Sequence, residues 1–135
     1  MRCTLVDDDP DFISIVRIWL WRLHAQLEIV AFASAADAMR FLASHRVDLL
    51  ITDFKMPGAN GLELVHDIRA READRHLPII VMSGEDIEPE ALAAGADAFV
   101  SKRDLHVRLG PTLEAVGFGF PARRAADQGA GIPRR

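Results

Sequence analysis

The sequence has little of several features that define common classes of protein. Its 135 residues include a single cysteine, Cys3, which excludes an internal disulfide. The most apolar segment, FISIVRIWLW, is interrupted by Arg17 and closed by Arg22, so it falls short of the ~20 apolar residues of a membrane span. The opening residues, MRCTLVDDDP, turn acidic where a signal peptide needs an apolar core. We therefore expect a cytoplasmic protein with no membrane insertion.

Basic residues are also scarce over most of the chain. Residues 1–116 hold 12 Lys and Arg against 19 Asp and Glu, and only residues 117–135 are net positive. Because such a body repels phosphate backbones, no direct binding of nucleic acid is expected. The five histidines show no paired ligand spacing, which argues against zinc. Only two lysines, Lys55 and Lys102, stand beside fourteen arginines, so each invites a specific explanation.

The chain does contain a regular alternation of short apolar runs and amphipathic segments. Asp9 before Pro10 predicts the start of a first helix, Ser34 that of a second, and Gly95 the end of a fourth. Gly110-Pro111 predicts either a break or a start in the last helix, because proline is not tolerated inside one. The five runs predict strands over residues 2–6, 27–32, 47–52, 77–82 and 97–100.

Strands that alternate with helices at this spacing predict βαβ units, hence a doubly wound α/β fold with one parallel sheet. In such folds ligands bind beyond the carboxyl ends of the strands. Five polar residues follow or end predicted strands there: Asp7, Asp8, Asp53, Ser83 and Lys102. We therefore expect three carboxylates, a hydroxyl and an ammonium group to meet at one edge of the sheet.

This set of groups predicts phosphoryl chemistry. Three carboxylates repel one another unless a cation lies among them, and oxygen ligands suit Mg²⁺. A metal held by Asp8 and Asp53 would attract phosphoryl oxygens, while Lys102 and Ser83 could bind others. Asp53 is then a candidate nucleophile that forms an acyl phosphate. Taken alone, Asp53 is more often a turn residue that accepts backbone hydrogen bonds, and only the complete set of site residues favours the nucleophile.

Four blocks of sequence together resemble the receiver domain of two-component response regulators: LVDDDP (5–10), LLITDFKMPGANG (49–61), IIVMSG (79–84) and GADAFVSK (95–102). The resemblance covers residues 1–116. It implies a flavodoxin-like, five-stranded parallel sheet in the order 2-1-3-4-5 with helices on both faces. Residues 117–135 are expected to form a flexible tail.

The resemblance also implies a role for each site residue. Asp53 would be the phosphate acceptor, fed by a histidine kinase or a phosphotransfer protein. Asp7, Asp8, Asp53 and the main-chain carbonyl of Lys55 would hold Mg²⁺. Ser83 and Lys102 would bind the phosphoryl group.

Ser83 and Phe99 would form a switch pair that reshapes the surface for a downstream protein. A proline joined by a cis bond often follows the family's lysine. Here Arg103 follows Lys102, so we expect a trans bond, because a non-proline cis bond costs about 2.5–4 kcal/mol.

Three classes of function are consistent with these residues. The first is a stand-alone receiver or phosphorelay intermediate that catalyses only its own phosphorylation and dephosphorylation, and that could form a homodimer. The second is a Mg²⁺-dependent phosphohydrolase, but related aspartyl phosphatases need an acid where Lys55 stands. The third is a pseudo-receiver that binds a partner without phosphorylation, and such proteins normally lack a key acid or the lysine.

Overall fold

The computed structural model of the chain describes residues 1–118; of the predicted tail over residues 117–135, residues 119–135 lie outside the described residues. Five parallel strands form one sheet in the order β2-β1-β3-β4-β5, which confirms the predicted fold class. The strands are β1 (Arg2–Val6), β2 (Glu28–Phe32), β3 (Leu49–Asp53), β4 (Ile79–Ser83) and β5 (Ala98–Ser101).

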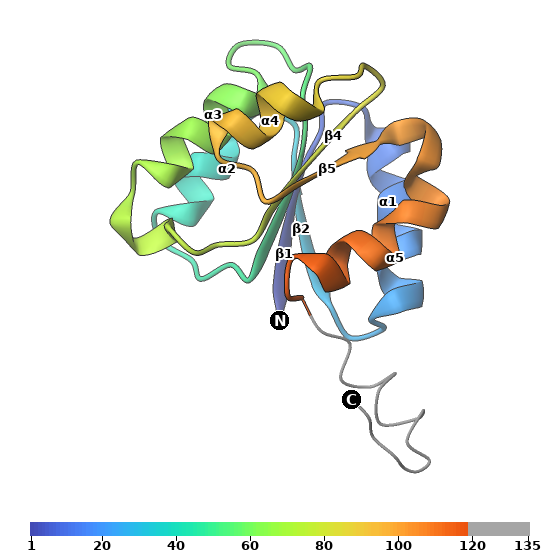
Figure 1. Cartoon of the computed structure of the whole chain (residues 1–135). Coiled ribbons are helices and arrows are strands. Elements are labelled where there is room, and N and C mark those ends of the chain that lie inside the picture. The colour runs from blue at the N-terminus through green and yellow to red at the C-terminus, as the bar shows by residue number, and fades with distance from the viewer. Residues whose placement is uncertain (119–135) are drawn as a thin grey trace.

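The helices cover both faces of this sheet. Figure 1 shows α1 and α5 on one face and α2, α3 and α4 on the other. Their bounds are α1 (Pro10–Leu23), α2 (Ala35–Leu42), α3 (Gly61–Arg69), α4 (Glu88–Ala94) and α5 (Leu105–Ala115), and two short 3₁₀ helices are η1 (Glu72–Asp74) and η2 (Lys102–Asp104).

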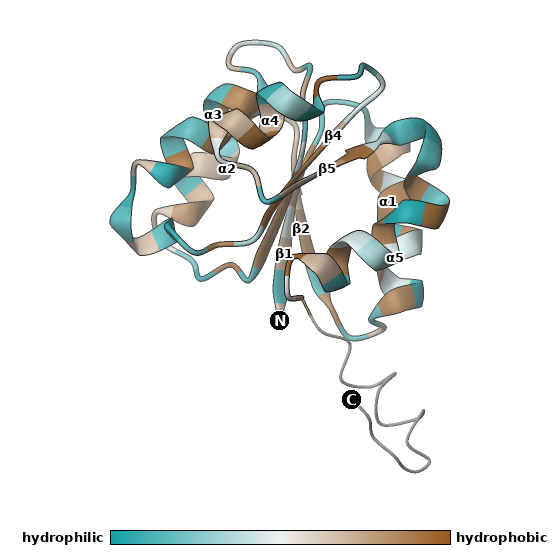
Figure 2. Ribbon diagram, viewed as in Figure 1, coloured by the Kyte–Doolittle hydropathy of each residue, from teal (hydrophilic) through white to brown (hydrophobic). Residues whose placement is uncertain are grey.

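Two hydrophobic layers hold the helices on the sheet, one on each face. Alternate side chains of β3 point to opposite sides, so that Ile51 packs under α1 and α5 while Leu50 packs under α2 and α3. Every residue of β3 and β4 is buried, which fits the apolar runs that open both strands before the polar residues at their ends (Figure 2). None of the described helices is long and apolar enough to cross a membrane.

Local capping explains where several helices begin and end. The Asp9 side chain accepts hydrogen bonds from the backbone N–H groups of Asp11 and Phe12, and Ser34 accepts one from Asp37, as predicted. Gly95 ends α4 in the left-handed conformation with φ +117°, also as predicted.

The expectation for the last helix is wrong. Helix α5 runs through Pro111, although proline removes one backbone hydrogen bond from a helix interior. Leu109 on one side of the proline and Leu113 on the other are both buried, and Gly110 lies against Leu23 of α1. This packing on both sides of the proline keeps the helix continuous, because tertiary burial outweighs local propensity.

The packed part of the chain extends two residues beyond position 116. Gly117, with φ +86°, donates its N–H to the Glu114 carbonyl, and Phe118 donates to Leu113. This pair of bonds is a Schellman motif, in which glycine takes the left-handed position. Phe118 is 2% exposed and packs in the layer under α1 and α5, so Gly117 and Phe118 form part of the folded body.

Candidate functional site

The sheet topology brings the predicted site residues to one end of the molecule. Asp53 is the last residue of β3 and Ser83 the last of β4, and Asp53 pairs with Met82 in the strand register. Asp7 directly follows β1, and Lys102 directly follows β5. The loops after β1, β3 and β4 all lie at the upper end of the sheet in Figure 1.

The three acids form one cluster. Asp7, Asp8 and Asp53 each offer a carboxylate oxygen, and these oxygens lie within 4.8 Å of one another. Asp7 is fully buried and Asp53 is 6% exposed, whereas Asp8 is open to solvent. Three oxygen ligands with one side open to water suit Mg²⁺, which keeps several of its own waters. The donor set therefore fits the predicted metal.

Lys102 reaches two of these acids. Its Nζ donates a hydrogen bond to Asp7 Oδ2 at 3.0 Å and lies 3.2 Å from Asp53 Oδ1. It also lies 4.2 Å from the centre of the Phe12 ring, at cation–π distance. Burial acts to lower the pKa of Lys102, but the hydrogen bond to Asp7 and the charges of Asp53 and Asp7 outweigh it and raise the pKa. Lys102 therefore stays charged at neutral pH.

Asp53 is held in an environment that opposes its charge. Burial, followed by repulsion from Asp7, raises the pKa of its carboxyl, while Lys102 and the N–H of Phe54 partly offset this. The Phe54 N–H donates to Oδ1 at 2.8 Å, the same oxygen that faces Lys102. A carboxylate that is both buried and repelled gains from a nearby cation or from a bond that removes its charge.

The loop after β3 is shaped by two glycines. Gly58 has φ +79°, a conformation that favours glycine. Gly61, the first residue of α3, donates its N–H to the Phe54 carbonyl, and a Cβ there would lie 2.1 Å from the Asp53 carbonyl oxygen. Only glycine permits this approach, so Gly61 sets the position of the Asp53 backbone.

Sequence reasoning did not assign Gly61 a role, nor Asn60 before it. The Asn60 side chain accepts from the Glu63 N–H, and the Glu63 side chain accepts from the Asn60 N–H, which forms a capping box. The sequence NGLE (60–63) could have predicted this capping box, because it has a cap residue followed by a glutamate three positions later.

Lys55 lies at the mouth of the site. Its Nζ pairs with Glu85, so that an exposed ion pair joins the loop after β3 to the loop after β4. The pairing raises the pKa of Lys55. A shallow hollow of about 510 Å³ lies beside the site and is lined by Asp8, Phe54, Lys55, Met56, Pro57, Gly58 and Asn60. Asp8 and the Lys55 segment therefore face the same open space, as the predicted metal requires.

Ser83 and Phe99, the predicted switch pair, lie at β4 and β5 in different environments. Ser83 is 2% exposed, and its Oγ accepts a hydrogen bond from the Glu85 N–H at 2.9 Å. Phe99 pairs with Val81 in the β4–β5 register and is half-buried on the side of α4. All peptide bonds of the described residues are trans, including Lys102–Arg103, as predicted.

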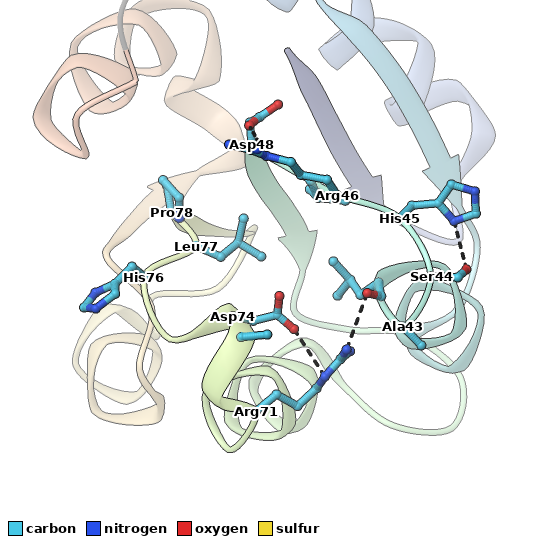
Figure 3. Close-up of a pocket in the computed structure, with 13 residues that line it drawn as sticks. Ala43, Ser44, His45, Arg46, Asp48, Arg71, Asp74, His76, Leu77 and Pro78 are labelled. Atoms are coloured by element: carbon cyan, nitrogen blue, oxygen red, sulfur yellow. Dashed lines mark hydrogen bonds and ion pairs between the residues drawn. The ribbon is translucent and has the colours of Figure 1, made fainter.

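A larger hollow, of about 700 Å³, lies at the opposite end of the sheet (Figure 3). Arg71 is directed toward Asp74 there, with Nε 3.2 Å from Oδ2, and Arg71 also donates to the Leu42 carbonyl at 3.4 Å. The hollow contains none of the predicted site residues. A phosphoryl group and one metal ion are small, so their site needs convergent charges more than volume.

Comparisons with known proteins agree with this geometry. The family model of the response regulator receiver domain matches residues 3–109, and the chain therefore belongs to that family. Receiver domains of the family accept a phosphoryl group on an aspartate and bind Mg²⁺ at an acidic pocket.

The relatives differ in how much of their length this chain covers. It is 34% identical to chemotaxis protein CheY of Pseudomonas aeruginosa in an alignment of 108 residues that covers 76% of this chain and 84% of CheY. It is 31% identical over 121 residues to the cyclic di-GMP phosphodiesterase response regulator RpfG of Xanthomonas campestris, covering 84% of this chain. The chain spans only 32% of RpfG and 29% of the response regulator PilR of P. aeruginosa.

Solved structures show the same fold. Chemotaxis response regulator CheY4 of Vibrio cholerae matches with a TM-score of 0.76 at 26% identity, over 85% of this chain and 97% of that one. Response regulator TrrA of Thermotoga maritima, solved in complex with Mg²⁺-BeF, matches with a TM-score of 0.75 at 26% identity and the same coverage.

Proposed function

We propose that Asp53 accepts a phosphoryl group from a histidine kinase or phosphotransfer protein in a Mg²⁺-dependent reaction, and that the change is passed on through protein–protein contacts. The observation that carries this proposal is the cluster at the carboxyl end of the sheet. A nearly buried Asp53 lies between two further acids and a lysine whose ammonium group is 3.2 Å from it.

The chemistry follows from the positions of these groups. The contacts of Asp53 with Phe54 and Lys102 use Oδ1, so we assign Oδ2 as the nucleophile. That oxygen forms a bond to phosphorus as the phosphorus–nitrogen bond of a phosphohistidine breaks, and the imidazole leaves with the electron pair. Lys102 can then turn from the carboxylates to a phosphoryl oxygen, and the Ser83 hydroxyl is close by to donate to another.

The metal would be held by Asp7, Asp8, Asp53 and the main-chain carbonyl of Lys55. Bound Mg²⁺ supplies positive charge that offsets the charge on the phosphoryl oxygens. Ser83 is released from the Glu85 N–H when it turns to the phosphoryl group, and Phe99 would turn inward with it. The Lys55–Glu85 pair joins the loop after β3 to the loop after β4 at the mouth of the site.

The proposal places the chain in the cytoplasm as a signalling module rather than an enzyme with a separate substrate. The test is intact-mass analysis after incubation with acetyl phosphate or phosphoramidate, with and without Mg²⁺. The wild type should gain one base-labile adduct of about 80 Da only with Mg²⁺, and Asp53→Asn should gain none.

Asp67→Asn is the matched control, since Asp67 is an exposed acid on α3 away from the site and should leave the adduct intact. If the folded wild type gains no adduct, a phosphorylation-independent binding module replaces the proposal.

A further inference from the structure

The loop between β4 and α4 is held on two sides by long basic side chains. The Arg103 guanidinium donates a hydrogen bond from Nη1 to the Gly84 carbonyl at 3.3 Å. On the other side, Lys55 forms its ion pair with Glu85, the next residue of the loop. Arg103 is not among the residues assigned to the metal or the phosphoryl group. A proline, which often follows the lysine in this family, has no side-chain donor and could not form the Arg103 contact.

The backbone of Arg103 is fixed, while the loop that it contacts has few other anchors. Arg103 lies in η2, where its N–H donates to Ser101 Oγ at 3.3 Å, and Leu105 directly after η2 is buried. By contrast, Gly84 is exposed, and a Cβ there would meet nothing within 4 Å. Helix α4 also begins without a side-chain cap. Of the two partners, the loop is therefore the one that can move more easily.

This loop also holds the Ser83 side chain. The Glu85 N–H donates to Ser83 Oγ, so the hydroxyl stays turned to the loop as long as the loop keeps its position. In the proposed function Ser83 leaves this N–H and turns to a phosphoryl oxygen. Gly84 lies between these two residues in the chain, so a contact that fixes its carbonyl favours the arrangement in which Ser83 faces the loop.

We propose that Arg103 is a positioning residue that latches the β4–α4 loop in the unphosphorylated arrangement. The inference rests on the proposed function of Asp53. A contact made in only one of two states lowers the population of the other state, and it weakens the apparent affinity of a ligand that binds that other state. The Arg103 hydrogen bond is long and exposed, so its contribution falls at the lower end of the usual range and the shift is about threefold.

The charge of Arg103 has an effect of the opposite sign, which makes the latch testable. A residue that acted only through its positive charge would attract anions, so its loss would weaken the binding of a phosphoryl group. A disturbance of the neighbouring Lys102 would also weaken that binding. Loss of a latch should instead tighten it, because the loop is released. Salt at about 0.5 M screens the charge and leaves the effect of the latch.

The test is a titration with beryllium fluoride and Mg²⁺, in which beryllium fluoride stands in for the phosphoryl group, followed by nitrogen–proton correlation NMR. In about 0.5 M KCl, Arg103→Met should lower the midpoint about threefold relative to the wild type. Before beryllium fluoride is added, the Glu85 amide resonance of this variant should already be displaced toward its position in the saturated protein. Arg103→Lys keeps a charged donor and should recover most of the wild-type midpoint.

Arg108→Met is the matched control, because Arg108 is exposed on α5 and its substitution removes the same charge. It should keep the wild-type midpoint, and the remaining resonances show that each variant is folded. A midpoint for Arg103→Met that equals or exceeds that of the wild type would overturn the latch, as would a Glu85 resonance that does not move. A folded wild type that binds no beryllium fluoride would instead overturn the proposed function, and the latch with it.

Discussion

At the amino end of the sheet acidic side chains lie beside arginines, whereas at the carboxyl end one lysine contacts two acids of a cluster of three. Arg2 pairs with Glu28, Arg46 with Asp48 and Arg69 with Asp97 at the amino end. At the other end Lys102 is the only basic residue of the described part of the chain that pairs with Asp7 and Asp53, and Asp8 adds a third negative charge. The first arrangement is balanced and serves the fold. The second has an excess of negative charge and should gain stability when a cation is added, as a metal-dependent site requires.

Removal of an arginine from the balanced end should give the largest loss of stability. The Arg69 guanidinium donates to the carbonyls of Gly95 and Leu77 at 2.9 and 2.8 Å and to Asp97 Oδ2 at 2.9 Å. It joins the end of α3 to the turn before β5, and its side chain is 18% exposed. Arg69→Ala should lower the free energy of unfolding by about 3 kcal/mol, since it leaves these partners unsatisfied.

Urea denaturation followed by circular dichroism measures this loss. Arg75→Ala is the matched control, because Arg75 is 62% exposed and pairs weakly with Glu72, at 3.8 Å. Its stability should stay within about 0.5 kcal/mol of the wild type. If Arg69→Ala were as stable as this control, the ion pairs at the amino end of the sheet would not stabilise the fold.

Loss of the lysine that contacts the acidic cluster should have the next largest effect. Lys102→Met leaves Asp7 and Asp53 without this positive partner, which should destabilise the protein by about 2 kcal/mol without metal. Mg²⁺ should then stabilise Lys102→Met more than the wild type, because the competing ammonium charge is gone. Free Mg²⁺ at ten times its dissociation constant should raise the free energy of unfolding by about 1.4 kcal/mol.

Thermal unfolding with and without Mg²⁺ measures both effects. Lys55→Met removes the other lysine, which is exposed and paired with Glu85, and should change neither the stability nor the response to the metal. An equal response to Mg²⁺ in Lys102→Met and the wild type would show that Lys102 and the metal do not share the acidic cluster.

The sequence predicted much of this site because parallel strands deliver their ends to one edge. Asp53 and Ser83 follow continuous apolar runs, and a buried parallel strand leaves such a run in the sequence. Asp7, Asp8 and Lys102 could be placed by the same rule before any distance was available. The positions of these residues could be predicted because each depends on its own strand and on the common direction of the strands.

Features that depend on distant backbone could not be predicted in this way. Gly61 is required by the Asp53 carbonyl oxygen, and Arg69 is held by residues up to 28 positions away. Helix α5 continues through Pro111 because Leu109 and Leu113 are buried in the core. The residues next to the proline in the sequence do not reveal this burial. The contacts of Lys102 with both Asp7 and Asp53 likewise depend on how three separate segments of the chain come together.

The smallest expected effect is a gain of stability from neutralising an acid at the unbalanced end. Burial and then repulsion from Asp7 raise the pKa of Asp53, so the folded state holds its proton to higher pH than the unfolded state does. Stability therefore falls as pH rises from the ordinary aspartate range through the folded pKa. Asp53→Asn removes this loss and should be more stable than the wild type at pH ~7 without metal.

The gain should be about 1 kcal/mol or less, since water at the open mouth of the site screens the repulsion. The difference should vanish at pH ~3, where both states of the wild type are protonated at Asp53. Asp97→Asn makes the same change at the balanced end, where the carboxylate binds Arg69 and the Ile79 N–H, and should instead lose stability. If thermal unfolding shows that Asp53→Asn gains stability and Asp97→Asn loses it, the acids at the two ends of the sheet have opposite effects on the fold. A loss of stability in both would mean that Lys102 already balances the site, so that the acid cluster does not need a further cation.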